Sequence, residues 1–372
     1  MAATGMGGRV GRDPHPAARR GSPVATALTV ALSIGALAVF LNYAIGHLNG
    51  YRVQLVVLVA INASIAIALT MTSGFTGVFS LGQIGFLAVG AYVGALVDLA
   101  PTWKAHTFLP GLPGWLAALD TSSWPHWAAL WTSSLAGGTV AALVSVVVGY
   151  PLMRLSGNYV AVATMGFLII VNAVLVHWDG VTLGSRGLNP IPGYTTVWWA
   201  YVWMIVVAYV AWRVRRSPHG RAMIATRENL IAARAVGVDV HRARMTAFVL
   251  GAFLTGVSGS FLGHQIGTVT PNAYYFTLTF NIIIMVVLGG LGSISGAVFG
   301  AVVLTLAPEY LRGVEDGMSL GPLSFGPAYG LSQIILAVGF ILVMIFRPKG
   351  VFGDREIQFD PTRWRRGRRV DP

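Results

Sequence analysis

The side chains that could carry out catalysis or bind a metal are few and scattered along the chain. There is no cysteine, which excludes disulfides, thiolate metal sites and cysteine nucleophiles. No two of the eight histidines lie four residues apart, and no Gly-x-Ser-x-Gly motif occurs. The two lysines, Lys104 and Lys349, are not followed by Ser or Thr, so neither completes a phosphate-binding P-loop. We therefore predict no catalytic centre, no metal site and no ATP hydrolysis by this chain.

Uncharged amides and glycines within long apolar runs are the remaining polar candidates. Side-chain amides there commonly hydrogen-bond neighbouring helices, but they could also line a path for a small amino acid or amide. Glycine runs can break a helix beside a transport path. The residues selected as translocation-path candidates are Gln83, Asn172, Asn281, Gly289, Gly290 and Gly292.

Ionisable side chains are expected only near the ends of the apolar runs. Those considered are Asp98, Arg154, His177, Asp179 and Glu309. A proton-coupled carrier usually needs a buried carboxylate or histidine at mid-membrane, so this placement disfavours a secondary carrier. The pair His264–Gln265 is expected at an outer helix end, where a plain membrane-interface role is favoured over contact with a binding protein.

The composition is that of an integral membrane protein. Of 372 residues, 55% are hydrophobic and 10% are charged, whereas soluble domains carry about 25% charged residues. The net charge of +12 could suggest nucleic acid. Because the basic residues cluster between apolar runs, they indicate membrane orientation instead, and no nucleic-acid partner is predicted.

Seven long windows contain no Asp, Glu, Lys or Arg, and a membrane-crossing helix needs roughly 20 apolar residues. The second window is long enough for two helices, split near 71–76. The sixth could hold three, split near 268–273 and at 289–292. We therefore predict an all-α bundle of about ten transmembrane helices. The windows are Gly21–Tyr51, Val53–Val97, Thr121–Met153, Leu155–Trp178, Gly187–Trp212, Met245–Pro308 and Gly317–Phe346.

Arginine placement predicts the orientation. The N-terminal tail, the loop 213–244 and the C-terminal tail hold 20 of the 25 basic residues, and short cytoplasmic segments are enriched in Lys and Arg. Both termini inside requires an even number of spans. The expected layout is a basic cytoplasmic tail at 1–23, a transmembrane domain at 24–346 and a basic cytoplasmic tail at 347–372. The first apolar run is expected to be retained, because it is longer than a signal-peptide core.

The loop 213–244 carries helix signals. Ser217 followed by Pro218 is typical of a helix start, and a second start is expected at Thr226, which would put Glu228 in a first turn. Gly237 is a natural helix stop. Alanines at 232, 233 and 235 would give a small-residue face that could seat in a groove of a partner protein.

Residues 227–237 resemble the loop through which bacterial ABC importer permeases couple to their ATPases. That pattern is Glu-Ala-Ala, three residues, then Gly. Ala232, Ala233 and Gly237 match it, whereas Ile231 precedes the alanines and Glu228 lies earlier. The departure resembles the branched-chain amino acid permease family, LivM-type subunit. Segments 72–92, 285–293 and 346–353 resemble it as well, so the likeness covers roughly 53–353. The coupling residues it implies are Arg221, Arg227, Glu228, Ala232, Ala233 and Gly237.

The resemblance implies a division of labour in a bacterial plasma membrane. Two ATP-binding subunits would bind ATP and Mg²⁺ and dock on the loop, so this chain would need no cofactor. A second permease subunit of the same family would complete the pore, and an extracytoplasmic binding protein would deliver branched-chain or related amino acids. The basic tails would contact anionic membrane lipids. The alternatives are the same machine for urea or short amides, and a stand-alone secondary carrier or channel.

Overall fold

The computed structural model describes residues 35–39, 41–108, 112–114, 119, 121, 123–155, 157–315, 319–320, 323–324 and 330–353. The predicted tail at 1–23 lies outside these residues, as does most of the tail at 347–372. The chain divides into two compact units. The unit of residues 1–46 and 357–372 is described only where it contributes to the apolar helix Gly35–His47.

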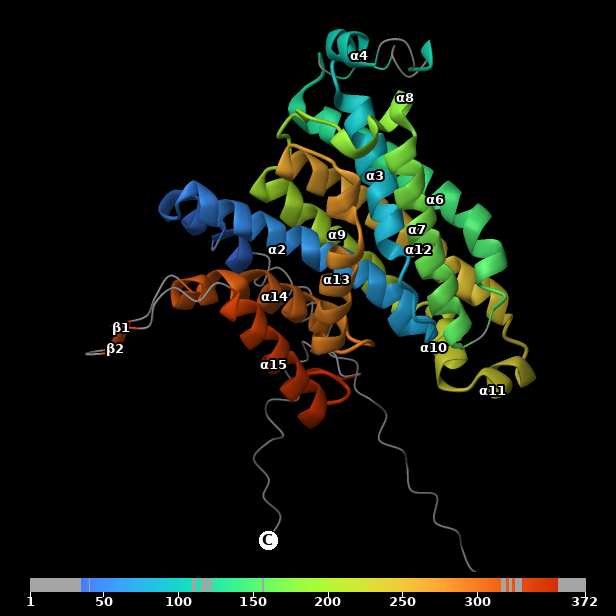
Figure 1. The fold of residues 1–372 in the computed structure, drawn as a ribbon. Helices are drawn as coiled ribbons and strands as arrows, with labels where there is room; N and C mark the ends of the chain where they lie inside the picture. Colours follow the sequence, from blue (N-terminus) through green and yellow to red (C-terminus); the bar gives the residue numbers. More distant parts are fainter. Residues whose placement is uncertain are drawn as a thin grey trace, which may run out of the picture. The chain divides into compact units, whose positions relative to one another are not determined.

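The unit of residues 47–356 is built from helices, apart from one pair of two-residue antiparallel strands, in the part of the chain that is described. Figure 1 shows the helices with their labels. Their bounds are α2 Gly50–Leu69, α3 Gln83–Asp98, α4 Pro101–Thr107, α6 His126–Leu152, α7 Asn158–His177, α8 Asp179–Thr182, α9 Val197–Arg216, α10 Pro218–Glu228, α11 Leu230–Ala235, α12 Val240–Ile266, α13 Phe276–Gly289, α14 Ile294–Glu315 and α15 Leu331–Phe346, with strands β1 Ser319–Leu320 and β2 Leu323–Ser324.

Seven of the described helices are long and apolar enough to cross a membrane. An eighth span results if α3 and α4, which meet at a bend of 110°, are counted together. Two shorter apolar helices, Gly35–His47 and α15, fall below that length. The structure is therefore that of a helical membrane protein, and the total of ten spans stays a prediction.

The predicted interruptions inside the long apolar windows are confirmed. The second window breaks after a π-helical segment, Thr70–Gly74, which continues α2, and α3 begins only at Gln83. The sixth window breaks between Ile266 and Phe276 and again between Gly289 and Ile294. A π-helical turn and glycine-rich breaks leave backbone groups without their usual helical partners, so these are the places where the chain bends most easily.

Glycines let α3, α6 and α12 pack backbone to backbone. A Cβ added at Gly90 would overlap the backbone of Gly256, and one at Gly137 would lie 2.5 Å from the Gly90 carbonyl oxygen. A Cβ at Gly259 would overlap the Leu87 carbonyl. Burial gives little driving force between helices in lipid, so close contact of this kind supplies much of the attraction. Glycine at these positions is therefore what allows the three helices to approach so closely.

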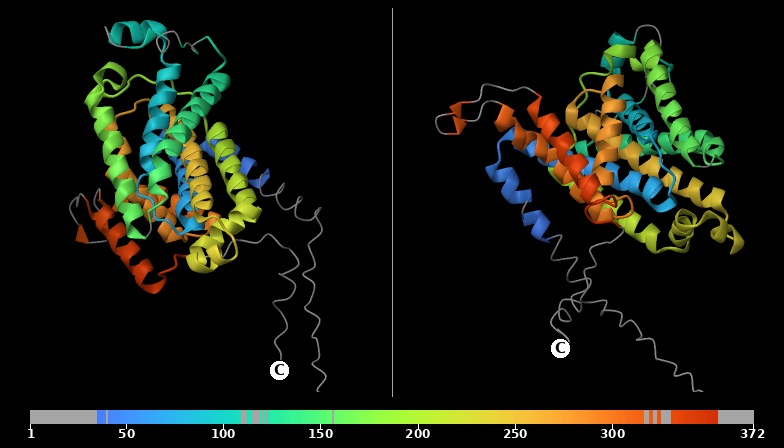
Figure 2. Two further views of the ribbon diagram at one scale, coloured as in Figure 1. Left: turned by 90° about the vertical axis from the view of Figure 1, so that its right-hand side faces the viewer. Right: turned by 60° about the horizontal axis from the view of Figure 1, so that its bottom comes forward.

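A second set of helices packs beside this seam. Helix α2 lies against α9, α14 and α12, and α13 lies against α14. Two views show α4 and the α10–α11 pair at opposite ends of the helical bundle (Figures 1 and 2). The unit thus has one end with α4 and the α7–α9 connection, and another with α10, α11 and the breaks after Gly74 and Gly289.

The glycine seam predicts opposite effects for two Gly→Ala substitutions within helices. Gly90→Ala forces α3 away from α12, and overpacking of this kind costs about 1–3 kcal/mol. At Gly166 in α7 no described atom lies within 4 Å of an added Cβ. Gly166→Ala should therefore gain about 0.5–1 kcal/mol from helix propensity. Thermal unfolding in detergent should show a lower Tm for the first variant and an equal or higher Tm for the second. Equal Tm values for both would contradict the seam.

Candidate functional site

The connection between α9 and α12 is a pair of short capped helices. Helix α10 begins as predicted: the Ser217 side chain accepts the N–H of Gly220 at 3.1 Å, and Pro218 occupies the first turn. Helix α11 ends before Gly237, whose φ of +83° is the left-handed conformation that glycine adopts without strain. The predicted stop at Gly237 is confirmed.

The predicted second start at Thr226 is wrong. Thr226 lies in the last turn of α10, where its hydroxyl donates to the Met223 carbonyl at 2.7 Å. The second helix starts instead at Asn229, whose side-chain oxygen accepts the N–H groups of Ile231 and Ala232 at 3.0 Å. Glu228 is consequently the last residue of α10 and does not stand in a first turn. Asn is as good an N-cap as Ser or Thr, and it provided the signal that the sequence analysis missed.

The alanine face of α11 is divided between the protein interior and its surface. Ala233 is buried, as is Met223 of α10, whereas Ala232 and Ala235 are exposed. Beside them Ile231 and Val236 are 81% and 79% exposed. This six-residue helix and the residue that follows it thus present two branched apolar side chains outward, while one alanine is buried inward. Exposed apolar side chains at such a position indicate an interaction surface.

Arg227 links the connector to the break that follows α2. Its Nη1 donates to the Gly74 carbonyl at 2.9 Å, and a Cβ added at Gly77 would lie 3.1–3.3 Å from the Arg227 stem. Its Nε lies 3.7 Å from Oε1 of the exposed Glu228. Among the other coupling candidates, Arg221 is exposed and donates to the Arg216 carbonyl at 3.3 Å. The structure brings Arg227, and not Arg221, to a break between membrane helices.

Arg215 makes the corresponding contact at the second break, although no sequence motif indicates it. Its Nη1 donates to the Gly292 carbonyl at 2.7 Å, and its guanidinium lies 5.8 Å from the Phe75 ring centre. Hydrogen bonds from a charged group contribute about 1.5–3 kcal/mol each. The sequence gives Arg215 only as one of the basic residues of the loop 213–244, because charge alone does not say which of them face the interior.

The break at Gly289–Gly292 is held on several sides. Val351 and Phe352 donate their N–H groups to the Leu288 and Gly289 carbonyls at 2.9 and 3.0 Å. These carbonyls stand at the end of α13, where helical partners are lacking. Gly290 has φ +116°, and a Cβ there would lie 2.6 Å from the Gly353 carbonyl oxygen. The segment after α15 therefore caps α13, which gives the glycines of that segment a structural role.

The two breaks meet each other next to a small cavity. A Cβ added at Gly74 would overlap the Leu291 carbonyl, so only glycine allows this approach. The cavity has a volume of about 110 Å³. It is lined by Phe75, Arg215, Ile224, Arg227, Glu228 and Gly292. Side chains of the connector and backbone of both breaks therefore share one site.

Three of the amides inside the bundle hydrogen-bond between helices. Gln83 donates to the Thr255 hydroxyl at 2.7 Å, Asn62 to the Thr305 hydroxyl at 3.0 Å, and Asn172 to the Pro271 carbonyl at 3.1 Å. Asn281 is exposed. Within the described residues, the Gln83 carbonyl oxygen is buried with no hydrogen-bond partner. A path-lining role for Gln83, Asn172 and Asn281 stays a prediction.

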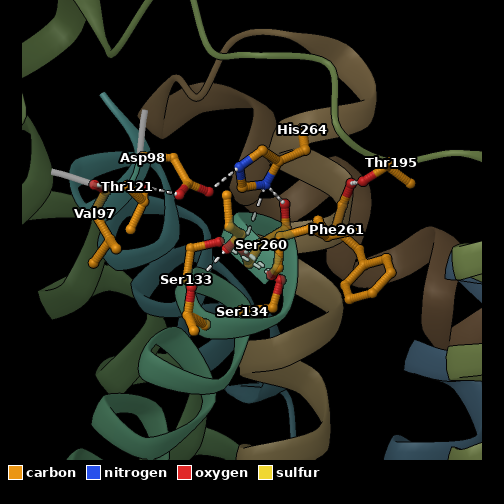
Figure 3. Close-up of polar contacts among 12 residues, drawn as sticks. Val97, Asp98, Thr121, Ser133, Ser134, Thr195, Ser260, Phe261 and His264 are labelled. Carbon is orange, nitrogen blue, oxygen red and sulfur yellow. Dashed lines mark hydrogen bonds and ion pairs between the residues drawn. The ribbon is translucent and has the colours of Figure 1, made fainter. Parts of the chain in front are cut away.

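An acidic and a basic side chain form a buried pair at the opposite end of the bundle (Figure 3). Asp98 is the last residue of α3, and its Oδ2 lies 2.7 Å from His264 Nε2 near the end of α12. Both side chains are fully buried. The Thr121 hydroxyl donates to Asp98 Oδ1 at 2.5 Å. The His264 ring faces inward to Asp98, whereas a partner contact of the His264–Gln265 end stays a prediction.

The partners of His264 define where hydrogens sit. Its Nδ1 lies 2.8 Å from the Ser260 carbonyl, which can only accept, so Nδ1 carries a hydrogen. A second hydrogen must then lie between Nε2 and the Asp98 carboxylate. The ring of Tyr194 stacks at 5.8 Å on His264, and burial together with the Asp98 charge raises the pKa of Tyr194. Removing either member of such a pair leaves an uncompensated buried group.

Comparison with known proteins adds a family. The profile described as "Branched-chain amino acid transport system / permease component" matches residues 51–345. The permease LivM of Escherichia coli is 27% identical over 80% of this chain and 69% of its own length. BraD of Pseudomonas aeruginosa is 26% identical over 80% of this chain and 92% of its own length. The autoinducer 2 import permease LsrC of Escherichia coli is 32% identical over 39% of this chain and 45% of its own.

A LivM permease of Salmonella typhimurium is matched over 66% of its length, so this chain spans about two thirds of its LivM relatives. No solved structure matches. The match to the family covers most of the chain, including α2 through α14 and the connector. Together with the described helices, it shows that this chain belongs to the permease components of branched-chain amino acid transport systems.

Proposed function

We propose that this chain carries branched-chain or related amino acids across a bacterial plasma membrane as one of two permease subunits of an ATP-driven importer. One observation carries the proposal. Ile231 of α11 and Val236 directly after it are exposed, while Arg227 at the end of α10 is hydrogen-bonded to a break between membrane helices. A protein that pushes on this surface would therefore act directly on the membrane helices.

Two ATP-binding subunits are the proposed occupants of that surface. They would bind ATP and Mg²⁺, because this chain lacks a P-loop. Ile231 of α11 and Val236 after it would enter an apolar groove on one of them, and Arg221, Glu228 and Ala232 would lie at its edge. An extracytoplasmic binding protein would deliver the solute at the end that carries α4, and a second permease subunit would complete the path.

Charge placement supports the orientation that this arrangement needs. The end that carries α10 and α11 also carries Arg154 and the segment that begins at Arg347. Short basic segments are retained in the cytoplasm, so this end is proposed to be cytoplasmic. The proposal also includes ten spans with both termini in the cytoplasm. The basic tails at 1–23 and 347–372 would lie on anionic lipid.

The proposed solute is inferred from the similarity to LivM and BraD, whose names specify branched-chain amino acid transport. The same machine could transport urea or short amides. The rival class, a stand-alone carrier or channel, would work without an ATPase. The buried Asp98–His264 pair is the feature that a proton-coupled carrier could use, but the pair lies at helix ends outside the connector.

The docking surface predicts the effect of a charge at Ile231. Ile231→Glu should abolish co-purification of the ATP-binding subunits and ATP-dependent uptake, because a carboxylate cannot enter an apolar groove without a partner. Tyr310→Glu is a matched control, because Tyr310 lies in α14, outside the connector, and is 80% exposed, as Ile231 is 81% exposed. Equal co-purification with both variants would exclude this surface as the docking site.

The connector geometry predicts a second pair of effects. Gly237→Arg places a side chain at φ +83°, and Glu228→Lys replaces the partner of Arg227 by a like charge. Both variants should lower uptake by about tenfold or more, the effect of about 1.4 kcal/mol. Gly237→Asn should keep most uptake, because Asn tolerates the left-handed conformation. Solute affinity of the binding protein should not change. Normal uptake by both charge-changing variants would refute the coupling role.

A further inference from the structure

We infer that Arg215 and Arg227 act together as positioning residues, transmitting movement of the α10–α11 connector to both helix breaks at once. The inference rests on the proposed function and assigns the transmission to two side chains. Arg215 is the residue that neither sequence pattern nor family resemblance indicated. Arg215 lies in the last turn of α9, directly before the connector, and Arg227 lies in the last turn of α10 within it; each reaches a different break.

Arg227 spans the first break. It precedes the N-cap of α11 by two residues, so any rotation of α11 moves its backbone. Its guanidinium binds the Gly74 carbonyl, at the end of the π-helical segment, and its stem packs on Gly77 beyond that segment. The side chain therefore holds both sides of the junction that leads from α2 to α3.

Arg215 joins the second break to the first. It lies in the last turn of α9 and donates to the Gly292 carbonyl, between α13 and α14. The same guanidinium faces the ring of Phe75, which follows Gly74 directly. Because a Cβ at Gly74 would overlap the Leu291 carbonyl, the two breaks are also in direct backbone contact. Movement at one break must displace the other.

The carbonyls that these arginines bind are suited to such a link. The Gly74 carbonyl stands at the end of the π-helical segment, and the Gly292 carbonyl lies in the turn between α13 and α14, so an arginine can bind each of them without breaking a helical turn. The adjoining cavity of about 110 Å³ is lined by both guanidiniums and by Gly292 and Phe75. The side chains are thus next to space into which they can shift while the rigid α3–α6–α12 seam keeps its packing.

The test uses the full chain, assembled with its second permease subunit and ATP-binding subunits in proteoliposomes. The variants are Arg215→Gln, Arg227→Gln, their combination, and the two Arg→Lys variants. Arg242→Gln is the matched control, since Arg242 lies in the first turn of α12, at the end that adjoins the connector, and its side chain is 86% exposed. The measurements are subunit co-purification, Tm, ATP hydrolysis with and without solute-loaded binding protein, and solute molecules imported per ATP.

We expect Arg215→Gln and Arg227→Gln to keep their ATP-binding subunits, Tm and basal hydrolysis. The number of solute molecules imported per ATP should fall about tenfold in each, as for loss of one charged hydrogen bond. The double variant should import no fewer solute molecules per ATP than the single variant with the lower ratio, because both residues act in one link. Lysine should restore part of the ratio, since an ammonium can still donate to the carbonyl.

Three results would overturn the inference. An unchanged import-to-ATP ratio in both glutamine variants would show that the contacts transmit nothing. Loss of the ATP-binding subunits would show that the arginines shape the docking surface instead. A fall in Tm with equal loss in the lysine variants would show a role in folding alone. The proposed function would fail only if the unaltered chain bound no ATP-binding subunit. None of the three results above implies that failure.

Discussion

The structure depends most on the contact between two interrupted helices at one end of the bundle. Gly74 ends the π-helical segment after α2, and the Leu291 carbonyl of the α13–α14 break fills the space where a Cβ would be. Backbone groups freed by both breaks are satisfied from outside the helices: by Arg227, by Arg215, and by the N–H groups of Val351 and Phe352. An exposed connector and a membrane interior are thereby joined through backbone hydrogen bonds.

The rest of the bundle supports this junction by being rigid. The α3–α6–α12 seam leaves no room for a Cβ at Gly90 or Gly259, so these helices are expected to move as one body. At the far end the Asp98–His264 pair fixes the end of α3 to α12 without exposure to solvent. Movement is therefore easiest at the breaks, where Arg215 and Arg227 bind.

Much of this architecture follows from the sequence, because charge-free runs and glycines act locally. The interruptions near Gly74 and Gly289 and the helix start at Ser217 are set by adjacent residues, and all three were predicted. The predicted start at Thr226 was wrong because Asn229, three residues later, caps the second helix instead. Asp98 and His264 are 166 residues apart, so only the packing of α3 on α12 could bring them together. Arg215 was missed for the same reason.

Labelling of one introduced cysteine would test most directly whether the connector faces the cytoplasm and receives a motor protein. The chain has no cysteine, so Ala232→Cys on the exposed side of α11 gives a signal without background. A membrane-impermeant maleimide should fail to label it from outside intact cells and should label it in inverted vesicles, with protection when ATP-binding subunits are assembled. Labelling from outside intact cells would contradict the account.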